Sequence, residues 1–173
     1  MEGNIYNLDY FEGYLRNCSK FAEDIAKIRW SFVREAKPRT VLDYGSGVGW
    51  FRAFRPKDVK VDTYDIGNYP QTGIRRKQYD LICLWDVLEH IPNFNSIGSL
   101  LSNTHYVATT VPIKPKGVKM ETWKHFKPGE HLHYFTLKTL DLFFKKYGFQ
   151  RIKNGSPECP PREDIVSVLY RKI

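Results

Sequence analysis

The fold of this chain is decided by one stretch, Val41-Leu42-Asp43-Tyr44-Gly45-Ser46-Gly47-Val48-Gly49-Trp50. It opens with an apolar run that predicts a short buried strand, and it continues with glycines at alternate positions. A strand that turns on glycines into a helix leaves backbone N–H groups uncovered beside the positive end of that helix. The stretch therefore predicts a turn where a ligand can approach the backbone closely.

A second acidic residue, Asp65, follows the glycine turn at a spacing typical of nucleotide-binding folds. Asp65 lies 22 residues after Asp43 and ends a second predicted strand, Val61-Asp62-Thr63-Tyr64. An acidic side chain about 20 residues downstream, at the carboxyl end of the neighbouring strand, can accept hydrogen bonds from ribose hydroxyls. The dinucleotide pattern G-x-G-x-x-G is excluded, because it needs a small residue where this chain has Trp50.

The pattern D-x-G-x-G-x-G resembles motif I of the class I S-adenosylmethionine (SAM) dependent methyltransferases. The resemblance continues through 79–92, similar to the family's fourth strand and the loop after it, and through a fifth strand at 106–111. It covers roughly residues 39 to 149 in the family's order. It implies SAM as the cofactor. The implied donor site consists of Asp43, Gly45, Ser46, Gly47, Gly49, Asp65, Ile66 and Trp85.

The resemblance implies an α/β fold, a three-layer Rossmann-like sheet that is mostly parallel and closes with a C-terminal antiparallel hairpin. The hairpin strands are expected at 149–153 and 165–170. Only residues 66–78 separate Asp65 from the next predicted strand, too few for a crossover through a further strand and two helices. We therefore predict that the family's third strand and its preceding helix are reduced or missing. This leaves the adenine contacts unassigned.

Residues 1–173 are expected to form one methyltransferase domain, with an N-terminal helical arm at 1–38 and a SAM-binding core at 39–173. The arm repeats apolar residues at the three- and four-residue steps of an amphipathic helix that ends before Pro38. These residues are Phe11, Tyr14, Leu15, Cys18, Phe21, Ile25, Ile28 and Phe32. Near the other end, Thr136 is a good N-cap for a helix that stops at Gly148.

Composition narrows the class of protein. No apolar run reaches the length of a bilayer span, and the first residues do not read as a signal peptide. Cys18, Cys83 and Cys159 include no C-x-x-C pair, so neither disulfides nor a structural zinc site is indicated. We expect a cytoplasmic protein that does not act at a membrane. Nothing in the sequence specifies its oligomeric state.

The net charge of +8 suggests an anionic partner. Residues 111–127 hold Lys114, Lys116, Lys119, Lys124 and Lys127 against a single carboxylate, with aromatic side chains between them. One interpretation is a solvated surface loop. The other is recognition of the acceptor, because the segment leaves the carboxyl end of a strand, where open α/β sheets bind ligands. Under the second interpretation a nucleic acid is a candidate partner.

Candidates for proton transfer follow the fourth predicted strand. Asp86, Glu89 and His90 are spaced to share one helical face, and His131 and His133 would point the same way from an extended segment. We take His90, Asp86, His131 and His133 as catalytic candidates. The competing interpretation of Asp86 and Glu89 is a capping box at the start of a short helix.

The same residues resemble the E-x-x-E-H and downstream histidine of the metal-dependent 2′-O-methyltransferases that act on small-RNA 3′ ends. The resemblance implies a divalent metal, Mg²⁺, Mn²⁺ or Zn²⁺, held by Asp86, Glu89, His90 and either His131 or His133, with His133 as the preferred fourth ligand. The first acid is Asp86 where that pattern has Glu.

The sequence thus predicts a SAM-dependent methyltransferase that acts on an oxygen or nitrogen nucleophile of a small or anionic acceptor. Two alternatives stay open at this point. One is an RNA 2′-O-methyltransferase with a divalent metal, and the other is a non-catalytic SAM-fold scaffold or regulatory subunit.

Overall fold

The structure, a computed structural model, describes residues 8–67, 71–160 and 162–173. Its centre is a six-stranded sheet in the order β2-β1-β3-β4-β6-β5. The strands are β1 (Thr40–Tyr44), β2 (Lys60–Tyr64), β3 (Tyr79–Trp85), β4 (Thr104–Pro112), β5 (Phe149–Gly155) and β6 (Ile165–Lys172). Strands β1 to β4 are parallel, whereas β6 runs antiparallel to both β4 and β5. The predicted sheet and its closing hairpin are confirmed.

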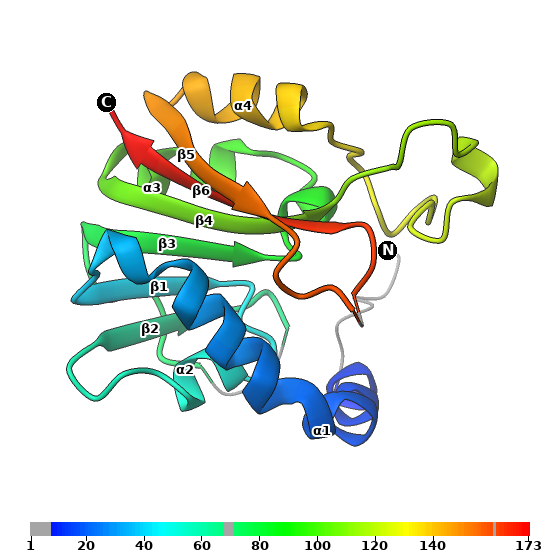
Figure 1. Cartoon of the computed structure of the whole chain (residues 1–173). Helices are drawn as coiled ribbons and strands as arrows, with labels where there is room; N and C mark the ends of the chain where they lie inside the picture. The colour runs from blue at the N-terminus through cyan, green and yellow to red at the C-terminus, as the bar shows by residue number, and fades with distance from the viewer. Residues whose placement is uncertain (1–7, 68–70, 161) are drawn as a thin grey trace.

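Helices cover both faces of this sheet (Figure 1). Helices α1 (Leu8–Phe32) and α2 (Trp50–Ala53) lie on one face, and α3 (Asn95–Ser102) and α4 (Leu137–Lys145) lie on the other. Short 3₁₀ turns stand at η1 (Arg34–Ala36), η2 (Leu88–His90) and η3 (Met120–Thr122). Helix α1 ends before Pro38 as predicted. The side chains of Phe11, Tyr14, Leu15 and Cys18 lie outside the described part of the chain.

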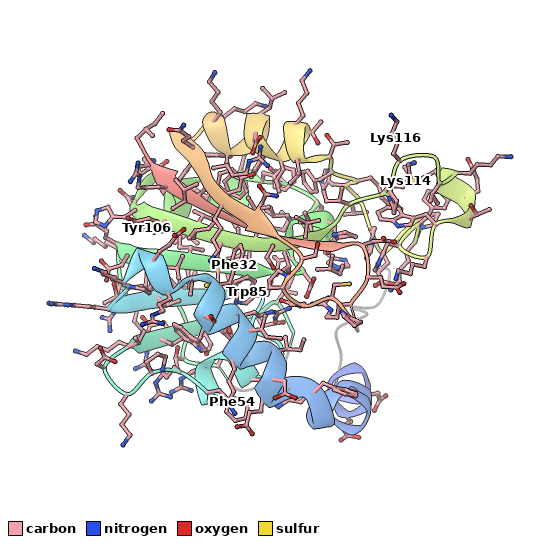
Figure 2. All side chains as sticks on the ribbon, viewed as in Figure 1. Phe32, Phe54, Trp85, Tyr106, Lys114 and Lys116 are labelled. Atoms are coloured by element: carbon pink, nitrogen blue, oxygen red, sulfur yellow. The ribbon has the colours of Figure 1, made fainter. Side chains whose placement is uncertain are left out.

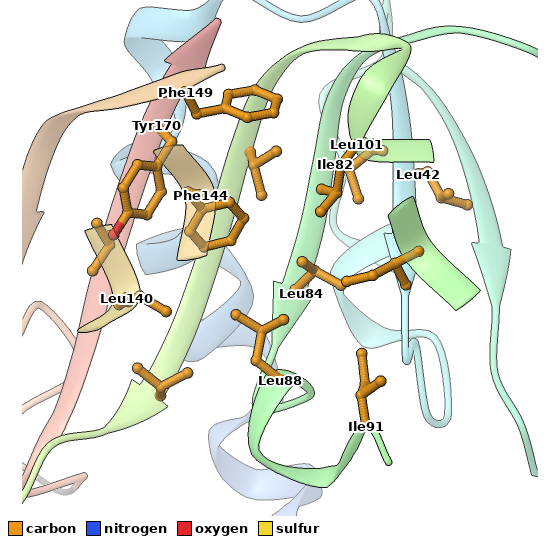
Figure 3. Packing of buried hydrophobic residues seen from close by; sticks show 14 of the residues in the cluster. Leu42, Ile82, Leu84, Leu88, Ile91, Leu101, Leu140, Phe144, Phe149 and Tyr170 are labelled. Atoms are coloured by element: carbon orange, nitrogen blue, oxygen red, sulfur yellow. The ribbon is translucent and has the colours of Figure 1, made fainter. Parts of the chain in front are cut away.

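Two apolar clusters hold the layers together. On the α1 face, Trp30 stacks on Phe51 with ring centroids 4.2 Å apart, and Phe51 meets Trp85 edge to face. On the other face, side chains of the sheet interlock with α3 and α4, and Figure 3 shows Leu101, Leu140 and Phe144 among them. Because Trp85 ends β3, the first cluster fixes one wall of the sheet's carboxyl edge.

The reduction of the third strand is confirmed. Between β2 and β3 no helix or strand is formed by the described residues 65–67 and 71–78. Thr72 and Thr63 exchange hydrogen bonds there, so this short segment runs beside β2. The sheet therefore ends at β2, and the carboxyl end of β2 lies at the border of the molecule.

The chain between β4 and α4 projects from the carboxyl edge of the sheet (Figure 1). We call residues 113–135 the lobe. Its base is closed by an isolated bridge between Ile113 and Phe135, and the indole N–H of its buried Trp123 donates to Asp164 at 3.0 Å. The lobe is thus attached to the loop between β5 and β6. No helix in the described residues is long and apolar enough to cross a membrane.

Candidate active site

The glycine turn after β1 needs glycine for two separate reasons. Gly45, Gly47 and Gly49 have φ angles of 79°, 52° and 83°, in the left-handed region that side chains rarely adopt. A Cβ at Gly45 would also overlap Val87 Cγ2, in the turn after β3. The N–H groups of Gly45 and Ser46 donate to the carbonyl oxygen of Tyr64, at 2.7 and 3.1 Å. The turn is therefore held between the ends of β2 and β3.

Asp65 is the centre of a second set of contacts. Its carboxylate accepts hydrogen bonds from the N–H groups of Gly47 at 2.7 Å and Gly67 at 2.8 Å. The side-chain amide of Gln71 pairs with both backbone groups of Asp65. Beside it, Ile66 is 70% exposed. The end of β2 thus presents a fixed carboxylate and an open apolar side chain.

Two polar atoms beneath the glycine turn are buried without a hydrogen-bond partner among the described residues: Asp43 Oδ2 and the indole nitrogen of Trp85. Burial raises the pKa of Asp43, the charge of Arg29 opposes this rise and the charge of Asp65 adds to it, which together leave the pKa at about 7. An unpaired buried acceptor and an unpaired buried donor are costly. Both residues line the same cavity.

That cavity occupies about 630 Å³ and lies at the carboxyl ends of β1, β2 and β3. This is the edge at which open α/β sheets bind ligands, and the volume falls within the usual range for small-molecule pockets. One end is formed by the glycine turn, Asp65 and Ile66, and the other by Glu89, His90 and His131. The lobe contributes His125, Lys127 and Glu130 to the second end.

Glu89, His90 and His131 form a compact cluster whose ligand-type atoms all lie within 4.8 Å of one another. The Oε2 atom of Glu89 is buried without a hydrogen-bond partner among the described residues. Burial raises the pKa of Glu89 to about 8, and the negative charge of Asp86 contributes. At neutral pH the carboxyl group therefore holds a proton in most molecules.

The two imidazoles of this cluster are fixed by backbone carbonyls. His90 Nδ1 lies 3.0 Å from the carbonyl oxygen of Glu130, and His131 Nδ1 lies 2.9 Å from that of His125. A carbonyl can only accept, so each Nδ1 carries the proton and each neutral ring keeps its lone pair on Nε2. Burial, followed by the neighbouring His90, lowers the pKa of His131, which keeps this ring neutral.

Known proteins with a similar sequence pattern or fold are methyltransferases. A family model described as a methyltransferase domain matches residues 11–154. The chain belongs to the methyltransferase domain family. Its fold is that of the class I SAM-dependent methyltransferases, as the motif around Asp43 predicts. No curated protein matches its sequence.

Solved structures show how the same fold is used elsewhere. Magnesium protoporphyrin IX methyltransferase from Synechocystis, with S-adenosylhomocysteine (SAH) bound, superposes with a TM-score of 0.65 at 15% identity, covering 87% of this chain and 83% of that one. The 1,6-didemethyltoxoflavin N1-methyltransferase of Burkholderia thailandensis, with its substrate and SAH, gives 0.64 at 16% identity over 95% and 85%. A candidate O-methyltransferase from Nostoc punctiforme gives 0.64 at 16% identity; this chain spans 93% of its own length but 60% of that protein. Identities this low establish the shared fold.

Asp86, predicted as a catalytic residue and a metal ligand, is held instead by two arginines and Thr110. Asp86 Oδ2 pairs with Arg29 at 2.9 Å, and Oδ1 pairs with Arg162 at 2.9 Å and accepts from the hydroxyl of Thr110. Glu158, which is buried, also binds both arginines. Although burial alone would raise the pKa of Asp86, the charges of Arg162 and Arg29 lower it to about 2. Asp86 is thus held by ion pairs, and it lies outside the Glu89, His90 and His131 cluster.

The capping-box interpretation of Asp86 and Glu89 is wrong. The turn η2 begins after Val87 with no side-chain cap, and Asp86 has a left-handed φ of 60°. The two residues therefore do not share the helical face expected from their spacing. The reason lies in Thr110, whose backbone and side chain both accept from the Asp86 N–H and fix a turn where a helix was expected.

His133 also departs from its predicted role. Its Nε2 atom lies 2.9 Å from the carbonyl oxygen of Ile91, and its ring packs on Phe94. The N–H groups of Leu132 and His133 both donate to the carbonyl oxygen of Glu89, which an extended strand cannot do. His131 and His133 consequently do not point the same way. The predicted metal set of Asp86, Glu89, His90 and His133 is not assembled, and His131 takes the place beside Glu89 and His90.

The lysines of the lobe are mostly occupied within the protein. Lys114 donates to the carbonyl oxygens of Pro115 and Val118, Lys124 pairs with Glu163 at 3.0 Å, and Lys127 pairs with Glu130 at 3.1 Å. Lys116 and Lys119 are exposed. The lobe lines the cavity with His125, His131 and the paired Lys127 and Glu130, so its basic run is a weaker anion site than the sequence suggests.

Sequence reasoning missed the two arginines that pair with Asp86. Arg29 lies on α1 and Arg162 on the loop between β5 and β6, far from any motif. Their partners Asp86 and Glu158 lie 57 and 129 residues away from Arg29. No local pattern could have paired them, because a charged residue on an amphipathic helix normally faces solvent.

Proposed function

We propose that this methyltransferase binds SAM at the glycine turn and transfers its methyl group to an oxygen or nitrogen nucleophile of a small acceptor held against His90 and His131. One observation carries the proposal: a single cavity joins the glycine turn and Asp65 to the Glu89, His90 and His131 cluster, whose two imidazoles can accept a proton on Nε2. Donor and acceptor can therefore meet within one cavity.

The donor end offers a partner for each part of SAM. Asp65 would accept hydrogen bonds from the ribose hydroxyls. The exposed Ile66 beside it would pack on the adenine, whose contacts the sequence leaves unassigned. Asp43 Oδ2 and the Trp85 indole N–H, both unpaired, suit the ammonium and carboxylate of the amino-acid end. Ligand binding would thus satisfy two buried groups that the described residues leave without a hydrogen-bond partner.

Methyl transfer from SAM requires the protein mainly to position the donor and the acceptor. The acceptor's lone pair attacks the methyl carbon in line, and the carbon–sulfur bond breaks as its electrons pass to sulfur, which turns the sulfonium into a neutral thioether. A protonated acceptor must then lose its proton, and the Nε2 lone pairs of His90 and His131 are suitable bases. The protein's main contribution is alignment and exclusion of water.

Replacing Asp65 tests the donor site. Titration calorimetry should show SAH binding to the wild type and loss of at least about tenfold in affinity for Asp65→Ala, since two charge-assisted hydrogen bonds to ribose disappear. Asp58→Ala removes an exposed carboxylate ahead of β2 and serves as the matched control, with affinity unchanged. Equal affinity in the wild type and Asp65→Ala would refute the assignment.

Replacing the imidazoles tests the acceptor end. His90→Ala and His131→Ala should lower the rate of SAH release in the presence of a mixed acceptor pool by about 10² or more, the usual value of a general base. The affinity for SAH should change little in both variants. His133→Ala is the control, because its ring lies outside the cavity, and it should keep its activity. Activity that survives in both cavity variants would remove the proton-accepting role.

A second candidate function rests on the Glu89, His90 and His131 cluster, which also has the composition of a divalent-metal site. Both rings donate Nδ1–H to backbone carbonyls, the arrangement typical of metal-ligating histidines, and Glu89 Oε2 lacks a partner among the described residues. These three residues would hold the ion, and the ion would lower the pKa of an acceptor hydroxyl. This reading favours O-methylation, including that of an RNA 2′-hydroxyl.

Manganese binding distinguishes the two readings. Electron paramagnetic resonance of added Mn²⁺ should show a site in the wild type that is lost in Glu89→Gln and kept in His133→Ala. Turnover should then stop on addition of a chelator. If Mn²⁺ stays free in solution and turnover persists with the chelator, the cluster acts through its imidazoles alone.

A further inference from the structure

The edge of the sheet opposite the cavity is strongly basic. Because β1 to β4 are parallel, they all begin at this edge, and the antiparallel β6 ends there. Register places Lys60 beside Thr40, Arg171 beside Tyr106, and Lys172 beside Phe149. We call the segments 34–39, 55–60, 75–77, 145–146 and 171–172 the amino edge. Each carries at least two lysine or arginine residues.

Most of these cations are available to a partner. Lys57, Lys60, Lys77, Lys145, Lys146 and Arg171 are exposed, and none pairs with a carboxylate of the described residues. The carboxylates nearby are few. Glu35 and Asp58 are exposed, whereas Asp80 is occupied by the N–H groups of Arg39 and Thr40. The lysine and arginine residues of the amino edge outnumber these carboxylates by more than the net charge of the whole chain, +8. The remaining residues therefore carry no net positive charge.

The positive charge is thus segregated on one side of the molecule. Figure 2 places Tyr106 near the amino edge and Lys114 and Lys116 of the lobe at the opposite end. Around the cavity the charges pair internally, as Arg29 and Arg162 do with Asp86 and Glu158. A one-sided field of this kind steers a polyanion to the amino edge rather than to the cavity.

The order of the strands arranges these segments in a row. Along the sheet, the segment 55–60 lies at the start of β2, 34–39 at the start of β1 and 75–77 at the start of β3. His105 follows at the start of β4, then 171–172 at the end of β6 and 145–146 ahead of β5. Adjacent strands lie about 4.8 Å apart, so the row spans about 24 Å. We propose that the amino edge binds the phosphate backbone of a nucleic acid, independently of sequence and separately from the cavity.

A membrane surface fits these observations less well. Basic membrane-binding surfaces carry a face of apolar side chains that enters the headgroup region. The exposed apolar residues next to these segments, Phe54, Ile74 and Ile173, belong to three different segments. A line of exposed cations without apolar anchors matches the counterion-release mode of nucleic-acid binding.

The test compares two triple variants of equal charge change. Lys60→Glu, Lys77→Glu and Lys146→Glu together alter the amino edge. Lys116→Glu, Lys119→Glu and Lys138→Glu together alter exposed lysines of the lobe and α4, which also have no carboxylate partner among the described residues. Fluorescence anisotropy measures binding of a labelled single-stranded RNA of mixed sequence at several salt concentrations. Thermal unfolding and SAH affinity, measured in parallel, show that each variant is folded.

We expect wild-type affinity for RNA to fall steeply with salt, and the amino-edge variant to bind at least about tenfold more weakly, with a salt slope smaller by about 2. The lobe variant should lose less than about threefold by the same electrostatic argument. SAH and RNA should bind together without competition. These outcomes do not depend on the proposed methyl transfer, because SAH affinity is read separately.

Three results would overturn the proposal. The first is RNA binding that is absent even at low salt, or equally weakened in both triple variants. The second is displacement of RNA by SAH, which would place the RNA in the cavity. The third is binding to phosphatidylserine vesicles that depends on the amino edge while RNA does not bind, which would assign the surface to a membrane.

Discussion

At the residue scale, Asp43 illustrates how a binding group can weaken the protein that carries it. The carboxyl group is 1% exposed, and burial raises its pKa to about 7. A raised folded-state pKa contributes stability that is present below the unfolded value of about 3.8 and is lost as the pH rises through about 7. The protein thus holds a partly ionised carboxylate at neutral pH, whose Oδ2 has no hydrogen-bond partner among the described residues. A ligand ammonium would relieve this cost.

Asp43 should therefore make donor binding depend on pH. SAH affinity should fall as the pH drops below about 7, by up to about tenfold per pH unit, because protonated Asp43 cannot pair with an ammonium. Asp43→Asn should bind SAH weakly at every pH and should raise the free energy of unfolding at pH 8, by an amount on the order of a few kcal/mol. Calorimetry and thermal unfolding across pH 5 to 9 measure both effects. A pH-independent affinity in the wild type would contradict this role.

At the element scale, the turn after β1 packs directly on the turn after β3. Gly45 faces Val87 so closely that no Cβ fits, while nothing lies within 4 Å of a Cβ placed on Gly49. The two glycines share a left-handed φ and differ only in their surroundings. This contact couples the donor turn to the segment that carries Glu89 and His90.

Alanine substitutions at Gly45 and Gly49 separate the cost of a left-handed backbone from the cost of overlap with Val87. Gly49→Ala should cost about 1–2 kcal/mol of stability, the price of a left-handed backbone alone. Gly45→Ala should cost about 2–5 kcal/mol, since overlap is added, and should weaken SAH binding. Val87→Ala in the Gly45→Ala background should recover part of both losses. If Gly45→Ala and Gly49→Ala prove equally mild in thermal unfolding, the two turns are not packed as described.

The ionic network is a second contact between elements, because it joins α1 to the loop between β5 and β6. Glu158→Gln removes the buried one of the two carboxylates that face Arg29 and Arg162, and should cost about 3–5 kcal/mol by leaving a cation uncompensated. Glu163→Gln breaks the exposed pair with Lys124 and should cost less than about 1 kcal/mol. Chemical denaturation compares them. Similar small losses in both variants would show that the buried network carries no special weight.

The network also predicts acid sensitivity. Since the folded-state pKa of Asp86 is lowered to about 2, its contribution to stability is complete above its unfolded value of about 3.8 and is lost as the pH falls toward 2. Asp86→Asn should flatten the loss of stability over this acidic range. An unchanged acid profile in the variant would indicate that other carboxylates govern it.

At the scale of the whole molecule, local patterns predict the framework well and the long-range polar contacts poorly. The glycine turn, the reduced third strand and the strands of the final hairpin follow from local spacing, and the sheet that joins distant strands follows from the family resemblance. The role of Asp86 and the separation of His131 from His133 depend on Arg29, Arg162 and Glu89, which only folding brings near. The location of the positive charge likewise follows from strand direction rather than from any basic run.

The most direct test of the account is a crystal structure grown with excess SAH. It should show the ribose hydroxyls on Asp65, the amino-acid end between Asp43 and Trp85, and the sulfur facing the Glu89, His90 and His131 cluster. A cavity that stays free of ligand, or SAH bound elsewhere on the protein, would contradict the central claim that this edge of the sheet holds the methyl donor.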